Sequence, residues 1–327
     1  MLARVIAAFA AGSIAATGLA APYPEPVDLG HGVHVFVGVR EEASQANGGH
    51  IANQGFIVAA EGVIVIDSGL SAEFAKHMLR VIHSRTGKPV ALVILTWPMD
   101  EAIFGAALFQ DRGAPVLAHE AAARLIAERC ERCLAQRRTT LGEALMAGTR
   151  VPRPDRVFRG SQSLSVAGRK LELIDEDGAA ARGSIAVWDP QSGVLFAGGL
   201  ASFGRIPDSA DGALDVWIKA LGRLAALPAR TVVPAHGMPG ARGDLRTVSG
   251  YLDALQTRTQ KAYAAGMSLL DAPRRVAVPE YQAWALYEAV HPRNVHHAYL
   301  ALEQRELLGE PPKGVGRVPE GNARGNP

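Results

Sequence analysis

The sequence predicts a mixed fold of strands and helices, of the α/β or α+β class, that ends in a helical segment. Short apolar runs bounded by turn residues indicate strands, and apolar residues at helical spacing follow several of these runs. This succession of strands and helices occurs twice along the chain, and from Leu245 to Leu307 the pattern is helical only. With 327 residues, 48% of them hydrophobic, the chain is long enough to bury a large core.

The first half is predicted to open with a β-hairpin. The stretch "NQGFIVAAEGVIVIDSG" reads as two strands that turn at Glu61-Gly62. "VALVILT" is a continuous apolar run, which is typical of a strand buried on both faces. We expect strands at 34–38, 53–69 (the hairpin), 90–96 and 114–119, and helices at 71–87, 102–109 and 120–137.

The second half begins near Val157. Its strands are separated by turn residues, among them Asp189-Pro190 and Ser192-Gly193. We expect strands at 169–175, 184–189, 193–198 and 231–237, with a helix at 212–227. Residues 309–327 are rich in Pro and Gly and have no apolar period, so we expect a disordered tail there.

The N-terminal segment has the pattern of a secretory signal peptide. Arg4 precedes an uncharged run from Val5 to Ala21, which ends in small residues and is followed by a Pro-rich stretch. We expect residues 1–21 to be removed and the mature protein to be periplasmic or secreted. A retained membrane anchor is the alternative, because the run is near the lower length limit for a span.

The charge balance argues against a nucleic-acid partner. The chain has 34 basic and 32 acidic residues, a net charge of +2, and no Lys/Arg stripe or basic tail. No other segment is long and apolar enough to cross a bilayer, so we expect no membrane contact after signal cleavage.

The two cysteines, Cys130 and Cys133, lie three residues apart in a segment that reads as a helix. This spacing places both thiols on one helix face. In an oxidising compartment the two thiols could form a local disulfide. A redox-active pair is a second, more specific possibility, and a metal site is a third. All three possibilities stay open at this stage.

Several stretches, in order along the chain, resemble the metallo-β-lactamase superfamily. "GFIVAAEGVIVIDSG" is similar to its opening hairpin, which ends in an Asp that corresponds to Asp67. The turn after "VALVILT" is similar in position to the HxHxDH motif, and "VVPAHG" to a late strand with a metal-binding His, here His236. The resemblance covers about residues 30–305. It implies a four-layer αββα sandwich over residues 22–244, with a C-terminal helical extension over residues 245–308.

One branch is more similar than the rest. "ASFGRIP", "SIAVWDPQSGVLFAG" and "WALYEAVHPRNVHHAYLALE" resemble the quinoprotein relay system zinc metallohydrolases, which are exported proteins associated with quinoprotein dehydrogenases. This likeness implies a PQQ-dependent dehydrogenase system as the setting. Exported quinoprotein dehydrogenase or cytochrome components are the partners it suggests.

The resemblance implies zinc, but the zinc ligands of the family are missing here. In the HxHxDH positions stand Trp97, Met99, Glu101 and Ala102. A further His position falls on or near Ala180, and the bridging Asp position is Gly199. His236 is the only one of these family ligands that remains. Indole nitrogen does not ligate metals, and one His cannot hold a catalytic zinc.

We therefore expect no zinc cofactor and a non-catalytic accessory or binding protein. Trp97 and Met99 are bulky enough to fill the emptied cleft. Arg182 is expected to pair with Asp67, Asp100 or Glu101 in place of a metal ion. A helix N-cap is the other role for Asp100.

The alternative is an active metal-dependent hydrolase with a rebuilt ligand set. An oxygen-rich group could take a hard cation such as Ca²⁺ or Mn²⁺. Its members would be Asp67, Asp100, Glu101, Asp175, Glu176, Asp177 and His236. The competing reading of Glu176-Asp177-Gly178 is a solvated turn.

Overall fold

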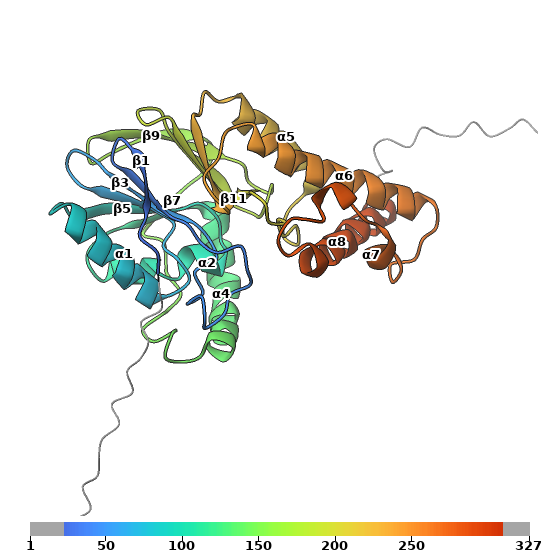
Figure 1. Cartoon of the computed structure of the whole chain (residues 1–327), viewed down its shortest axis with the longest axis horizontal. Helices are drawn as coiled ribbons and strands as arrows, with labels where there is room; N and C mark the ends of the chain where they lie inside the picture. The colour runs from blue at the N-terminus through green and yellow to red at the C-terminus, as the bar shows by residue number, and fades with distance from the viewer. Residues whose placement is uncertain (1–22, 310–327) are drawn as a thin grey trace, which may run out of the picture.

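A computed structural model describes residues 23–309, and it shows two β-sheets packed face to face with helices on both outer sides (Figure 1). This arrangement confirms the mixed fold and the αββα layering. The expected signal peptide and the tail beyond Gly309 lie outside the described residues.

The first sheet has seven strands in the order β1-β2-β3-β4-β5-β6-β7. The first four strands pair antiparallel, whereas β4 to β7 pair parallel. The strands are β1 (Val27–Gly30), β2 (Val33–Phe36), β3 (Gln54–Val58), β4 (Val63–Ile66), β5 (Val90–Leu95), β6 (Val116–His119) and β7 (Arg156–Phe158).

The second sheet has five strands in the order β12-β11-β10-β9-β8. Strands β8 to β11 pair antiparallel, and β12 joins β11 in parallel after a helical crossover. Its strands are β8 (Gln162–Val166), β9 (Arg169–Asp175), β10 (Ile185–Asp189), β11 (Val194–Ser202) and β12 (Thr231–His236).

Helices cover the outer face of each sheet. Against the first sheet lie α1 (Ala72–Arg85), α2 (Asp100–Ile103), α3 (Ala106–Gln110) and α4 (Glu120–Leu141). Against the second lie α5 (Leu214–Ala226) and α6 (Asp244–Ala264). Apolar side chains at helical spacing, such as Phe74, Met78 and Ile82 in α1, form the buried faces.

The space between the sheets is filled by β-branched and other apolar side chains. Ile57 and Ile94 from the first sheet meet Leu173 and Val187 from the second. Because these strands are buried on both faces, they read in the sequence as continuous apolar runs. The core between the sheets therefore fixes the positions of the ends of β5, β11 and β12 relative to one another.

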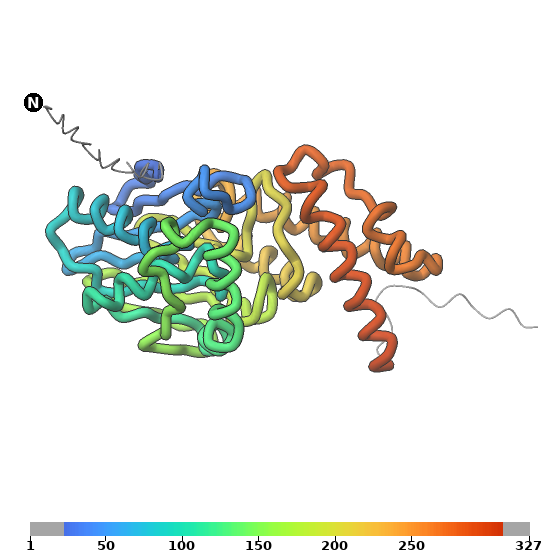
Figure 2. Tube along the Cα trace, turned by 90° about the horizontal axis from the view of Figure 1, so that it is seen from below, coloured from blue at the N-terminus to red at the C-terminus, as the bar shows by residue number. Residues whose placement is uncertain are grey.

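The C-terminal helical region lies beside the sandwich (Figure 2). It comprises the end of α6, then α7 (Ala272–Arg275), a 3₁₀ turn η1 (Pro279–Tyr281) and α8 (Tyr287–Leu307). The expected continuous helical pattern is interrupted between 265 and 286, where Gly266 has a φ of +73° and Pro273 and Pro279 begin short helices.

Among residues 23–309, none of the helices has both the length and the apolar character needed to cross a bilayer.

Candidate functional site

A cleft of about 390 Å³ opens where β5, β11 and β12 end. Parallel strands β4, β5 and β6 and the parallel pair β11–β12 bring these ends together, at the edge of the sheets where α/β folds place ligand sites. The C-terminal region supplies part of the wall through Val290 and Arg293 of α8.

The structure brings six of the eight predicted cleft residues to this opening. They are Trp97, Met99, Glu101, Ala180, Gly199 and His236. Ala102 instead packs in the core between the first sheet and its helices, where it is 1% exposed. Asp67 lies beneath the cleft and does not line it.

Asp67 fastens the end of β4 to the end of β5. Its carboxylate accepts hydrogen bonds from the Thr96 backbone N–H (2.8 Å) and the Thr96 hydroxyl (2.6 Å). Its φ of +57° lies in the left-handed region, which Asp tolerates better than most residues. Burial raises the pKa of Asp67 to about 7, against the effect of the two hydrogen bonds.

Trp97 occupies the space above Gly199. A Cβ placed on Gly199 would lie 2.1 Å from Trp97 Cε3, far inside contact distance. The indole also meets the His236 imidazole edge to face, with 6.2 Å between ring centres. No side chain at position 199 fits beside this indole, so the two substitutions depend on each other.

His236, at the end of β12, is held by polar contacts that involve both sheets. Asn53 donates to the carbonyl oxygens of Pro234 (2.8 Å) and Gly237 (2.7 Å), on either side of His236. The His236 Nδ1 atom lies 2.9 Å from the Ile51 carbonyl oxygen and 2.7 Å from the Nη1 atom of Arg205.

A guanidinium has no acceptor, so in its contact with His236 Arg205 donates and Nδ1 accepts. An Nδ1 atom that accepts this hydrogen bond carries no proton and cannot also donate to the Ile51 carbonyl oxygen, so the two contacts belong to alternative tautomers of His236. Burial, together with the adjacent charge of Arg205, lowers the pKa of His236 to about 3. The imidazole is neutral at physiological pH, and a fixed cation stands beside it.

Glu101 faces the other side of His236, with 3.6 Å between its Oε1 and His236 Nε2. Gln54 donates to the Glu101 carbonyl oxygen at 3.1 Å and so helps to hold α2. Burial and the neighbouring Asp100 raise the pKa of Glu101 to about 8. These surroundings favour the protonated form of Glu101.

Asp100 stays ionised because Arg137 of α4 grips it with two nitrogens, at 2.6 and 3.3 Å. Burial opposes ionisation, but the hydrogen bonds with Glu101 and Arg137 keep the pKa of Asp100 below its ordinary value. Asp100 is not a helix N-cap: Met99 precedes α2 without any side-chain cap.

The expectation that Arg182 replaces the metal is wrong. Arg182 is exposed and pairs with Asp177 at 3.2 Å. Asp177 also accepts from the Gly183 backbone N–H at 2.6 Å, which closes the turn before β10 upon itself and keeps Arg182 at the surface. The arginines beside the acids and His236 are instead Arg137 and Arg205.

Sequence reasoning missed both residues. Arg205 stands in "ASFGRIP", immediately after β11, and this position at a strand end is the signal that could have identified it. Arg137 comes from α4, distant in sequence from the acids that it contacts, and no local pattern points to it.

The acids of the second half do not join the cleft. Asp175 lies 3.3 Å from His119, and Glu176 is buried and paired with Arg223 rather than placed in a solvated turn. Within the part of the chain that the structure describes, no three His, Cys, Asp or Glu side chains form a potential metal site. The oxygen-rich cluster of the alternative hypothesis does not assemble among these residues.

The cleft does not fit zinc. At the ligand positions of the family it offers only the His236 imidazole and the Glu101 carboxyl group, and Arg205 lies against the Nδ1 atom of that imidazole. A zinc ion needs at least three protein ligands in catalytic sites, with no unneutralised cation at contact distance.

Cys130 and Cys133 line the cleft from α4 as free thiols. Burial and the neighbouring Cys133 raise the pKa of Cys130 to about 12, and burial also raises the pKa of Cys133. Reactive cysteines have a lowered pKa. The surroundings of these two thiols therefore disfavour the thiolate.

The C-terminal region positions Arg205. The Ala285 backbone donates to the Gly204 carbonyl oxygen and accepts from the Ile206 N–H, both at 3.0 Å. Ser202 adds a hydrogen bond to the Arg205 carbonyl oxygen at 2.9 Å. Contacts on both sides of Arg205 thus fix the loop that presents its guanidinium to the cleft.

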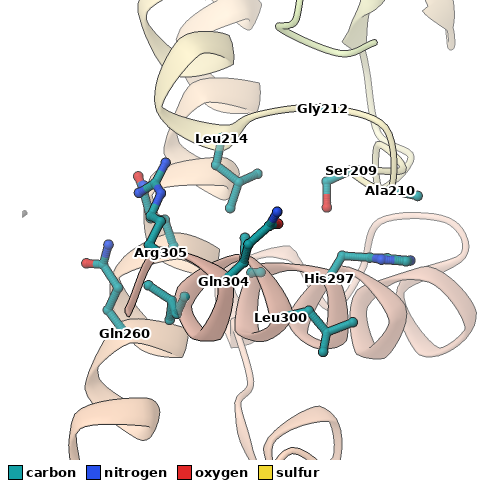
Figure 3. A pocket seen from close by; sticks show the side chains of 13 residues that line it. Ser209, Ala210, Gly212, Leu214, Gln260, His297, Leu300, Gln304 and Arg305 are labelled. Atoms are coloured by element: carbon teal, nitrogen blue, oxygen red, sulfur yellow. The ribbon is translucent and has the colours of Figure 1, made fainter. Parts of the chain in front are cut away.

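A second, smaller hollow of about 240 Å³ lies between α6, α8 and the loop before α5 (Figure 3). Ser209 points its hydroxyl toward α8, and His297 and Gln304 come from α8 itself (Figure 3). Ala210 lines both this hollow and the cleft, so the loop 207–213 separates the two.

Comparisons with known proteins agree with the fold. A family model described as the metallo-beta-lactamase superfamily matches residues 47–236, more than half of the chain. The metallo-beta-lactamase type 2 of Elizabethkingia meningoseptica is 25% identical over 159 residues, which cover 49% of this chain. The chain aligns with 56% of the length of that relative.

Solved structures of similar fold include a metallo-beta-lactamase from Pontibacter korlensis, with a TM-score of 0.58 and 23% identity, covering 70% of this chain and 98% of that one. A double mutant of the sec-alkyl sulfatase PisA1 has a TM-score of 0.67 and 16% identity, covering 87% of this chain and 50% of that one. At these identities the likeness shows the fold alone. By the family match and by this fold, the chain belongs to the metallo-β-lactamase superfamily.

Proposed function

We propose that this protein is a non-catalytic accessory or binding protein built on a metallo-β-lactamase fold. The observation that carries the proposal is that bulky and cationic side chains occupy the centre of the cleft. Trp97 excludes any side chain from position 199, and the guanidinium of Arg205 hydrogen-bonds the only His retained at a ligand position. A cleft remains, with polar and apolar walls but without the donors for a catalytic zinc.

We further propose export, and a setting in a quinoprotein (PQQ-dependent) dehydrogenase system. The N-terminal pattern of residues 1–21 supports export. The resemblance of residues 284–303 to quinoprotein relay proteins supports the setting and suggests exported dehydrogenase or cytochrome components as partners. Affinity capture on the mature chain from an exported fraction, followed by an assay for PQQ-dependent dehydrogenase, tests this link; no enrichment over an unrelated exported protein contradicts it.

Metal analysis tests the central proposal. The mature protein, purified without chelators, is expected to contain far less than one zinc per chain by mass spectrometry. A metal ion that binds only the folded state raises the melting temperature, and a chelator that removes the ion lowers it again. If no metal is bound, a chelator should leave the melting temperature unchanged. Stoichiometric zinc, or a chelator-induced fall in melting temperature, would overturn the proposal and favour the alternative of a metal-dependent hydrolase with a rebuilt ligand set.

A further inference from the structure

We infer that the cleft binds a small organic carboxylate through Arg205. The inference deepens the proposed function and rests on it, because it assigns the guanidinium the position that a metal ion would otherwise hold. It starts from Arg205, whose side chain is buried although only some of its N–H groups have a hydrogen-bond partner.

Arg205 is only 8% exposed, which is rare for an arginine without a carboxylate partner. Its Nη1 atom donates to His236, yet within residues 23–309 the side chain forms no ion pair with an acid. A guanidinium has five N–H donors. None of its nitrogens is among the fully buried atoms that lack a partner, so the unused donors remain accessible from the cleft.

The other arginines around the cleft show how its acids are used. Five arginines and five acidic residues line it, and three of these arginines, Arg129, Arg137 and Arg293, pair with three of the acids. Arg205 is buried beside these pairs, and within the described residues its guanidinium forms no such ion pair.

The surroundings of Arg205 favour an organic anion over a hydrated inorganic one. Trp97, Met99 and Ile206 supply apolar surface in the same cleft. An arginine fork binds a carboxylate bidentately, and a water-poor site strengthens that bond. A volume of about 390 Å³ is within the range of small-molecule pockets.

Paired ligands test this assignment on the intact mature protein. Benzoate and succinate are titrated by calorimetry and thermal shift beside their uncharged amides, benzamide and succinamide. At least one carboxylate is expected to bind tenfold or more tightly than its amide. Equal binding within both pairs, or binding of neither carboxylate, would overturn the inference.

Arg205→Met is expected to weaken carboxylate binding by about 10- to 100-fold, and Arg205→Lys by less, because lysine keeps the charge but loses the fork. Arg182→Ala removes the same charge from the exposed turn and should bind as the wild type does. If Arg205→Met does not fold, the binding of Arg205→Lys and the comparison of each carboxylate with its amide still test the inference. Undiminished binding by both Arg205 variants contradicts the inference.

These outcomes are separable from those of the metal analysis. A zinc-free protein that does not distinguish carboxylates from amides refutes the inference and leaves the proposed binding role standing. A protein with stoichiometric zinc refutes the proposed function itself.

Discussion

At the scale of single residues, the cleft is a set of mutually dependent substitutions. Trp97 needs glycine at position 199, and Arg205 needs a neutral imidazole at position 236. Glu101 tolerates burial because it is protonated, while Asp100 keeps its charge beside Arg137. Glu101 and Asp100 are thus neutral and paired, respectively, as burial in a low-dielectric site requires, whereas Arg205 is buried without an acidic partner.

Restoring an aspartate at position 199 should be harmful while Trp97 is present. Gly199→Asp forces a side chain into the indole and buries a carboxylate, so it is expected to cost about 3 kcal/mol or more of unfolding free energy. Trp97→His alone should cost about 3 kcal/mol through the emptied volume. The double variant should cost less than the sum, because one change removes the clash that the other creates.

Urea denaturation of the four proteins in this cycle measures the coupling directly. Additive costs would show that Trp97 does not obstruct position 199.

Glu101 should make stability fall as the pH rises. Its pKa in the folded state is about 8, above the ordinary value of 4.5, so the folded protein binds the proton more tightly than the unfolded chain. The resulting stabilisation is complete below about pH 4.5 and is lost as the pH rises to about 8. Glu101→Gln stays neutral and should gain stability relative to wild type over this interval, as followed by the melting temperature.

Asp67 contributes a similar slope up to about pH 7 in both proteins, and so cancels in the comparison. Parallel pH profiles for the wild type and Glu101→Gln would show that Glu101 ionises normally.

At the scale of elements, the cleft is built from strand ends and finished by helices. Strands β5, β11 and β12 set its floor, α4 contributes Arg137 and the two thiols, and the segment before α8 holds the loop of Arg205. The helices and their adjoining segments therefore determine which charged side chains lie at the floor of the cleft.

The two thiols on α4 should react slowly in the folded protein. The raised pKa values of Cys130 (about 12) and Cys133 leave little thiolate at pH 8. Iodoacetamide at pH 8 should alkylate Cys133 first, because it is less buried, and Cys130 only as fast as the protein opens. Mass spectrometry of the native and urea-unfolded protein measures both rates, with Cys130→Ser as the single-thiol control.

Rapid alkylation of native Cys130 would indicate an activated thiol and favour a redox role for the pair. A protein isolated with both cysteines unreactive even in urea would indicate the disulfide.

At the scale of the whole molecule, the cleft depends on contact between the two sheets. Asn53 precedes β3 in the first sheet, accepts from the Gly38 N–H, and donates to carbonyl oxygens on both sides of His236. One buried side chain therefore joins the two sheets at the floor of the cleft.

Asn53→Ala should destabilise the fold by about 2–4 kcal/mol, because it leaves one buried N–H and two buried carbonyl groups without partners. Asn47→Ala is a matched control. Asn47 also makes three hydrogen bonds to backbone groups, but in a partly exposed loop where water replaces them, so its loss should cost about 1 kcal/mol or less. Urea denaturation compares the two, and equal costs would show that Asn53 does not join the sheets.

The sequence by itself determined the layered fold and most of the cleft floor. Apolar runs such as Val90–Leu95 report burial on both faces, and an ordered series of motifs reports the family. The absence of ligands at positions 97, 99, 102, 180 and 199 is likewise a property of the sequence.

Only the tertiary structure decided which charges meet in the cleft. Arg182 is adjacent in sequence to a cleft turn, yet Asp177 holds it at the surface, whereas Arg137 and Arg205 come from a distant helix and a loop held by the C-terminal region. Burial follows a local periodic pattern of apolar residues, so it can be predicted from the sequence. Charge pairing depends on distances between separate elements, and those distances exist only once the two sheets and their helices have packed.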